Sequence, residues 1–309
     1  MICRFDIDDR NVVEWRWFVD DLNRIPEMVS GLVFEEGRCE EIEELNVNEN
    51  ENEWKNVRSI EVERNGLKGV RSVNVNGLNE LELLKVESGG LKNVERIVIG
   101  SNSLNGEMVF DVAKDVWKNV KSIEIGSGCL RRVSGEWIDL SGFEHSERIE
   151  IGSDSVNGIV NLRMNGLNVL NELEIGSGSL MTIERIEIGY DSLSSLSSLS
   201  SLDMSRFVNL KELIIGSGSL GEVESLKLNG LDRMEVGLGS LSGVKVLEIG
   251  DRTLNDRTFE TLDLRPFESV ERVEIGRDSL MNVESVWIDR NPYLREWIVG
   301  SNSLKMVER

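Results

Sequence analysis

The stretch Leu170-Asn171-Glu172-Leu173-Glu174-Ile175-Gly176-Ser177-Gly178-Ser179-Leu180 decides the fold, because its pattern recurs along the chain. Residues 210–220 repeat it as Leu210-xx-Leu213-x-Ile215-Gly216-Ser217-Gly218-Ser219-Leu220. A fixed, recurring unit is typical of a repeat protein. Further copies lie around Ile97, Ile123, Ile149, Ile186, Leu247, Val273 and Trp297.

Each copy reads as a short strand followed by a tight turn. Successive side chains of a strand point to opposite faces, so the two apolar residues of Leu173-Glu174-Ile175 share one face and the glutamate points away. The glycines of Gly176-Ser177-Gly178 let the backbone turn sharply. The closing Leu180 then returns to the core. A second version of the unit ends in Asn-Gly-Leu, as in residues 70–78 and 226–231.

At this point the pattern resembles the leucine-rich repeat superfamily. The apolar anchors recur at a spacing that alternates loosely between about 11 and 13 residues, and two such units make a coil of about 24 residues, inside the range of these repeats. The pattern L-x-x-L-x-L-x-x-N-x-L fits, and it is most similar to the divergent IGxxSL repeats of protist leucine-rich repeat proteins. The position of its conserved Asn is filled by Gly178, Gly218, Asn102, Asn302, Asp154 and Asp278.

The resemblance implies a leucine-rich-repeat-like solenoid, with one departure. Every half-coil carries a strand motif, so we expect two parallel sheets on opposite faces and few or no helices. We divide the chain into degenerate N-terminal repeats or a cap, residues 1–55, and a single continuous solenoid of regular repeats, residues 56–309. The unit at Gly230-Leu231-Asp232-Arg233-Met234 lacks three residues found in 166–173, which predicts a kink or a register fault there.

Charge and cysteine content narrow the class of protein. The formal net charge is -21, with 56 acidic and 35 basic residues. Nucleic acids and anionic membranes both favour a basic surface, so we expect neither as a partner. Cys3, Cys39 and Cys129 match no disulfide framework or zinc signature. The sequence shows no secretion signal and no membrane-spanning apolar run. We therefore expect a cytoplasmic or other intracellular protein without a cofactor.

No catalytic or metal-binding group stands out. The sole histidine, His145, sits in a turn before a strand, and serines are too common for a neighbouring one to indicate a catalytic triad. One histidine and three cysteines make a zinc site unexpected. Glu172 and Glu174 share a strand face, as the carboxylates of a polysaccharide-active β-helix enzyme would, but nothing singles out this pair. The sequence favours no enzyme.

The clearest surface feature is an acidic stripe of outward strand residues. Like charges on neighbouring strands repel each other by about 1 kcal/mol, which Arg148 beside Glu150 partly offsets. The stripe is either a solvated strand face or a surface that binds a basic protein segment or divalent cations. Trp287 and Ile298 are outward apolar residues that suit a binding contact. The stripe consists of Glu124, Glu150, Glu172, Glu174 and Asp203.

These patterns favour a non-enzymatic protein-binding scaffold, with the acidic stripe as its first contact surface and a basic segment as its partner. One alternative is a structural or surface element that assembles through its ends, because the sequence stops in mid-repeat at Val307-Glu308-Arg309 without a polar cap. A weaker alternative is a polysaccharide-active β-helix enzyme. Its active site would require long loops over one region, whereas the insertions here are short.

Overall fold

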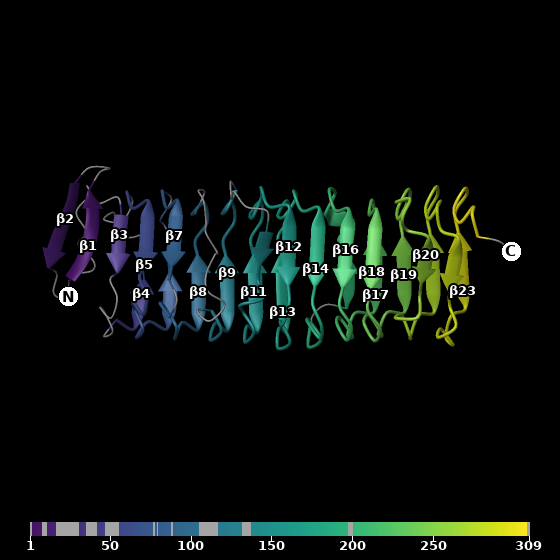
Figure 1. Ribbon diagram of the computed structural model, residues 1–309, viewed down its shortest axis with the longest axis horizontal. Coiled ribbons are helices and arrows are strands. Elements are labelled where there is room, and N and C mark those ends of the chain that lie inside the picture. The colour runs from purple at the N-terminus through teal and green to yellow at the C-terminus, as the bar shows by residue number, and fades with distance from the viewer. Residues whose placement is uncertain are drawn as a thin grey trace. The chain divides into compact units, whose positions relative to one another are not determined.

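A computed structural model describes residues 2–7, 11–16, 31–34, 42–46, 56–76, 78, 80–87, 89–104, 117–131, 137–196 and 200–307. The chain divides into two compact units, both built from short strands joined by turns (Figure 1). Unit 1 comprises Met1–Gly135, Gly142–Ile159 and Glu174–Leu180. Unit 2 comprises Glu136–Ser141, Val160–Leu173 and Met181–Arg309.

In unit 1 the strands from β3 to β8 alternate between two sheets. One has the order β2-β1-β3-β5-β7 and the other the order β13-β11-β9-β8-β6-β4. The strands are β1 Ile2–Ile7, β2 Asn11–Arg16, β3 Gly31–Phe34, β4 Glu44–Asn46, β5 Ser59–Val62, β6 Ser72–Asn74, β7 Leu83–Val86, β8 Arg96–Ile99, β9 Ser122–Ile125, β11 Arg148–Ile151 and β13 Glu172–Ile175, whose first two residues fall in unit 2.

In unit 2 the same alternation joins sheets of order β10-β12-β14-β16-β18, β15-β17-β19-β21-β23 and β20-β22. Figure 1 shows β14, β16 and β18 side by side. The strands are β10 Trp137–Asp139, β12 Asn161–Met164, β14 Arg185–Ile188, β15 Ser201–Asp203, β16 Glu212–Ile215, β17 Ser225–Leu228, β18 Arg233–Val236, β19 Val246–Ile249, β20 Thr261–Asp263, β21 Arg272–Ile275, β22 Ser285–Trp287 and β23 Glu296–Val299.

The register places equivalent residues of successive coils next to each other. Ile123 lies opposite Ile149 in unit 1, and Leu162 lies opposite Ile186 in unit 2, both in parallel pairs. Hydrogen-bonded partners on successive coils are commonly 24 residues apart, as at Ser155 and Ser179. The predicted repeat solenoid with about 24 residues per coil and parallel sheets is therefore confirmed.

The core of each unit consists mainly of branched aliphatic side chains. In β16 the relative exposure of Leu213 is 0% and that of Ile215 is 2%, whereas Glu212 and Ile214 are half-buried on the other face. This alternation follows from the two-residue period of a strand. Each aliphatic side chain buried in this way contributes about 1.5–3 kcal/mol.

Glycine follows many strands because the coils approach closely there. A Cβ atom added to Gly152 would lie 2.6 Å from the carbonyl carbon of Gly126 and 2.6 Å from the amide nitrogen of Ser127, both on the preceding coil. No real side chain tolerates such a contact. The recurring Ile-Gly of the repeat therefore marks the point at which backbone packs on backbone.

The turn after these strands contains two left-handed residues separated by one other residue. Gly178 has a φ of 72° and Leu180 a φ of 57°, while Asp278 and Leu280 have φ values of 54° and 55°. Gly, Asn and Asp tolerate this conformation, but a leucine is strained by about 1–2 kcal/mol. Leu180 and Leu280 are both 0% exposed, and their burial offsets that strain.

A buried serine lies between these two residues and joins the coils. The Ser179 hydroxyl donates a 2.6 Å hydrogen bond to the carbonyl oxygen of Gly152 and accepts a 3.0 Å bond from the amide of Ser155. Ser155 donates in the same way to Gly126 at 2.8 Å. This serine ladder satisfies buried backbone groups. It lies one position after the residues that match the conserved Asn of the leucine-rich repeat pattern.

β1 pairs antiparallel with both β2 and β3, unlike the parallel strands of the later coils. One local expectation is corrected. The shortened unit causes no register fault, because Met234 lies opposite Leu213 and Leu247 opposite Leu226 in unbroken ladders. The shortened unit is shorter only in the link between β17 and β18, and both strands keep their full length. The boundary at residue 55 stays a prediction.

Helical structure is minimal in the part of the chain that the structure describes. Its one helical element is the 3-10 helix η2, Met204–Arg206, whose first turn is capped by Asp203 accepting a 2.9 Å hydrogen bond from the amide of Ser205. Within the described ranges, no helix has the length and apolar character needed to cross a membrane.

Candidate functional site

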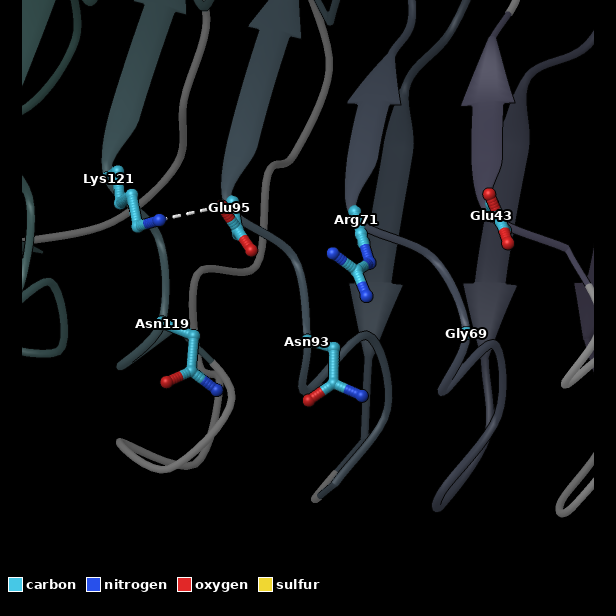
Figure 2. A pocket seen from close by; sticks show the side chains of 7 residues that line it. All are labelled: Glu43, Gly69, Arg71, Asn93, Glu95, Asn119 and Lys121. Atoms are coloured by element: carbon cyan, nitrogen blue, oxygen red, sulfur yellow. Dashed lines mark hydrogen bonds and ion pairs between the residues drawn. The ribbon is translucent and has the colours of Figure 1, made fainter.

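A polar pocket of about 650 Å³ opens on the edge of unit 1 (Figure 2). It runs along the turns that lead into β4, β6, β8 and β9. Each coil places a charged residue directly before its strand, and three of the coils add a second lining residue two positions earlier. The lining residues are Glu43, Gly69, Arg71, Asn93, Glu95, Asn119 and Lys121.

The charged residues form a ladder whose sign alternates. The amide of Arg71 donates to the carbonyl oxygen of Glu43, that of Glu95 to Arg71, and that of Lys121 to Glu95, so the four residues occupy equivalent positions on successive coils. The Lys121 ammonium lies 2.8 Å from a Glu95 carboxylate oxygen. Hydrogen bonding and charge from Lys121 lower the pKa of Glu95, to which Arg71 adds a smaller effect. Opposite charges thus face each other along the rim.

Two asparagines line the floor of the pocket in a fixed orientation. The side-chain nitrogen of Asn93 donates to the carbonyl oxygen of Lys68 at 2.9 Å, and that of Asn119 donates to Lys92 at 2.7 Å. Each amide group is thereby anchored to the preceding coil through its nitrogen, which leaves its oxygen as an acceptor. Gly69 occupies the equivalent position one coil earlier. Gly69 therefore contributes only backbone to the pocket lining.

The structure divides the predicted acidic stripe between sheets. Glu124 lies opposite Glu150 in unit 1, and β13, with Glu172 and Glu174, is the edge strand of the same sheet. Asp203 instead lies on β15 in a sheet of unit 2. Along that sheet Asp203 is followed by Lys227, Glu248, Glu274 and Ile298.

Two stripe glutamates form ion pairs with arginines on their own or a neighbouring strand. Glu124 pairs with Arg96 at 3.2 Å, and Glu150 with Arg148 at 2.9 Å. These pairs are exposed, so each contributes at most about 1 kcal/mol. They reduce the negative potential of the stripe.

Trp287 and Ile298 lie on the outer side of the last strands of unit 2. Their relative exposures are 45% and 43%, as their outward positions predicted. The guanidinium of Arg265 stacks 4.2 Å from the centre of the Trp287 ring. Asp263 holds that guanidinium with two hydrogen bonds, of 2.9 and 2.7 Å. Trp287 is therefore a fixed aromatic surface.

One network on the outer face of unit 2 escaped sequence reasoning. Trp137 is half-buried on the outer side of β10, with the Arg163 guanidinium 4.4 Å from its ring centre. Arg163 pairs with Glu187 at 3.2 Å, and Arg185 with Glu212 at 2.6 Å. Trp137 directly precedes the buried Ile138, so the two-residue period could have placed it outside.

The residues considered for catalysis are not brought together. His145 is exposed in a turn, while the hydroxyl of the adjacent Ser146 is buried and donates to the carbonyl oxygen of Val120 at 2.8 Å. Cys129 is a buried free thiol that takes a serine's place in the ladder and donates to the carbonyl oxygen of Gly100 at 2.7 Å. Across the described ranges, no three His, Cys, Asp or Glu side chains form a group suited to a metal ion.

Neither a known protein-family profile nor a curated protein sequence matches the chain. Among solved structures, the chain is similar to the functional domain of InlJ from Listeria monocytogenes, which includes a cysteine ladder. That match has 10% identity and a TM-score of 0.31, and covers 81% of this chain and 59% of the other. A leucine-rich repeat protein from Bacteroides ovatus matches with 12% identity and a TM-score of 0.18, over 94% of this chain and 91% of the other. These scores assign the chain to no family.

Proposed function

We propose that the chain is a non-enzymatic protein-binding scaffold of the leucine-rich repeat kind, built from divergent IGxxSL repeats. The observation that carries the proposal is a contrast between the inward-facing and the outward-facing residues of the coils. Inward positions repeat the same aliphatic, serine and glycine residues from coil to coil. Outward positions vary, as in the row Asp203, Lys227, Glu248, Glu274 and Ile298. A constant frame that displays variable side chains suits recognition of a protein surface.

The acidic stripe is the first contact surface in this proposal, and a basic segment is its partner. Glu174 is exposed on the edge strand β13 with Glu172 beside it, and Glu124 and Glu150 continue the row in the same sheet. A basic partner segment would exchange the weak intramolecular ion pairs for intermolecular ones. We place the protein inside the cell, which the buried free thiol of Cys129 supports.

Affinity capture with quantitative mass spectrometry tests this function. The full chain is compared with the variant Glu124→Lys/Glu150→Lys/Glu174→Lys. The control variant Glu187→Lys/Glu212→Lys/Glu235→Lys makes the same charge change on the outer face of unit 2. Partners lost with the first variant and retained with the control would support the proposal. A set of captured proteins identical for all three chains would contradict the stripe, and no specific capture by any of them would contradict the scaffold.

Self-association is a second candidate, which the exposed apolar side chains of the last strands favour. Trp297, Ile298 and Val299 on β23 have relative exposures of 36%, 43% and 41%. β23 pairs with β21 and ends its sheet order. An exposed apolar edge strand is a pairing site for another chain.

A further inference from the structure

A row of lysines runs beside the pocket of unit 1. Lys68, Lys92 and Lys118 each lie three positions before the charged ladder residue of their coil, in the segments 68–71, 92–95 and 118–121. These segments read Lys-Gly-Val-Arg, Lys-Asn-Val-Glu and Lys-Asn-Val-Lys. They hold five basic residues and a single acid, in a chain of net charge -21. A basic cluster thus adjoins the pocket.

Register brings these lysines onto one edge. Asn93 and Asn119 bind the carbonyl oxygens of Lys68 and Lys92, so the three segments lie on neighbouring coils. Parallel strands on neighbouring coils are about 4.8 Å apart. Like charges at that spacing repel each other by roughly 1 kcal/mol in water. Lys92 and Lys118 are exposed, and neither forms an ion pair with a carboxylate of the described residues. An anion bound over the row would relieve this repulsion.

Arg71 differs from the lysines at equivalent ladder positions. Lys121, Lys211 and Lys245 each pair with the glutamate of the preceding coil, at 2.8, 2.7 and 2.8 Å. Arg71 is exposed, and its charge acts on Glu95 without the close contact to a carboxylate that each of these lysines makes in the described part of the chain. Its side chain lines the pocket between those of Glu43 and Glu95 (Figure 2). A guanidinium in this setting suits two parallel hydrogen bonds to a carboxylate.

We propose that this pocket and its lysine row bind an acidic segment of a partner protein, an inference that rests on the proposed protein-binding function. One carboxylate of the segment binds Arg71, and further carboxylates lie over Lys92 and Lys118. The side-chain oxygens of Asn93 and Asn119 accept backbone N–H groups of the segment. Glu43 and Glu95 on the same rim favour a ligand that also carries hydrogen-bond donors.

The same features disfavour a nucleic acid as the ligand. A phosphodiester backbone has no N–H groups for the two asparagine oxygens. The cluster provides few phosphate contacts compared with a nucleic-acid-binding surface. An acidic peptide needs fewer cationic contacts than a nucleic acid, and its backbone N–H groups can donate to the two asparagine oxygens.

Fluorescence anisotropy with the full chain tests the proposal. The probe is fluorescein-labelled hexaglutamate, and labelled hexaglutamine and a single-stranded oligothymidylate are the comparison ligands. We expect hexaglutamate to bind and its affinity to fall as the salt concentration increases. The variant Arg71→Gln/Lys92→Gln/Lys118→Gln should bind hexaglutamate about tenfold more weakly. Gly69→Asn should also weaken hexaglutamate binding, because the added side chain would narrow the pocket. The variant should fold, because asparagine already occupies the equivalent positions 93 and 119.

The control variant Lys211→Gln/Lys245→Gln/Arg295→Gln makes the same charge change on ladder positions of unit 2 and should leave hexaglutamate affinity unchanged. An equal loss of hexaglutamate affinity in both triple variants would show that only the net charge matters, and it would overturn the proposal. Tighter binding of the oligothymidylate than of hexaglutamate would overturn it in favour of a nucleic acid. If hexaglutamate fails to bind while capture through the acidic stripe succeeds, this inference falls and the scaffold function stands.

Discussion

The hydroxyl of Ser279 donates a 2.6 Å hydrogen bond to the carbonyl oxygen of Gly250 on the preceding coil. It also accepts a 3.2 Å bond from the amide of Thr253. Ser279 and Thr253 are both 0% exposed, so no water replaces these bonds when the hydroxyl is removed. The serine ladder therefore stabilises the stack through its backbone as well as through its apolar core.

Ser279→Ala should lower the free energy of unfolding by about 1–3 kcal/mol, the cost of leaving buried backbone groups without partners. Equilibrium denaturation by urea, followed by far-ultraviolet circular dichroism, measures the change. Ser301→Ala provides the control, because Ser301 is exposed and its side chain takes no part in the ladder. Equal stability of the two variants would show that the ladder does not stabilise the fold.

Gly152→Ala should destabilise unit 1 by about 2 kcal/mol or more, because the new Cβ would overlap backbone atoms of the preceding coil. Gly221→Ala is a matched control. A Cβ at position 221 would have the Ser242 hydroxyl oxygen as its nearest neighbour, at 3.7 Å. That substitution should change stability by less than about 0.5 kcal/mol. Thermal melting of both variants measures the two changes in stability. A similar loss in both would show that the glycine requirement is not steric.

The repeat itself could be predicted from the sequence because its causes are local. The alternation in Leu173-Glu174-Ile175 and the following glycines require no knowledge of neighbouring coils. The closing leucine was predicted to reach the core, and Leu180 does. Its left-handed backbone was not predicted, since a leucine gives no sign of a positive φ that only its burial can offset.

The surface was harder to predict because it depends on which coils are adjacent. Glu124 and Glu150 were correctly placed on one face, but their pairing with Arg96 and Arg148 depends on side-chain reach. Asp203 was assigned to the same stripe by counting units, and it lies in a different sheet. The pocket was missed because its lining residues come from four successive coils, and only the register between those coils brings them together.

Cys129 should resist modification in the native protein. Burial raises the pKa of its thiol above the ordinary value of 9.0, so the reactive thiolate is scarce at neutral pH. Because the native state holds the proton more tightly than the unfolded chain, this group lowers stability as the pH rises above 9.0. Peptide mapping after iodoacetamide treatment should find Cys129 labelled in urea and unlabelled without it. Cys129→Ser should retain stability, since serine fills the equivalent ladder positions, whereas Cys129→Ala should not.

The carboxyl group of Asp263 should have a pKa below its ordinary value. Hydrogen bonding from the Arg265 side chain is the main reason that the pKa of Asp263 lies below 3.8. The stabilisation from this depressed pKa is present above 3.8 and is lost as the pH falls through the folded value. Carboxyl titration by nuclear magnetic resonance should show the depressed pKa, and Arg265→Gln should return it toward the ordinary value. An unchanged titration in that variant would assign the shift to another cause.

Ile298→Lys should abolish any pairing through β23. The edge strand presents Trp297, Ile298 and Val299, and a lysine at its centre would place a charge in the apolar contact between two chains. Light scattering coupled to size exclusion should show the mass of the unmodified chain rising with concentration and that of Ile298→Lys staying constant. Ile214→Lys is the control, because Ile214 lies outward on β16, which has strand partners on both sides. A mass independent of concentration in the unmodified chain would contradict self-association and leave recognition through the outward faces as the function to pursue.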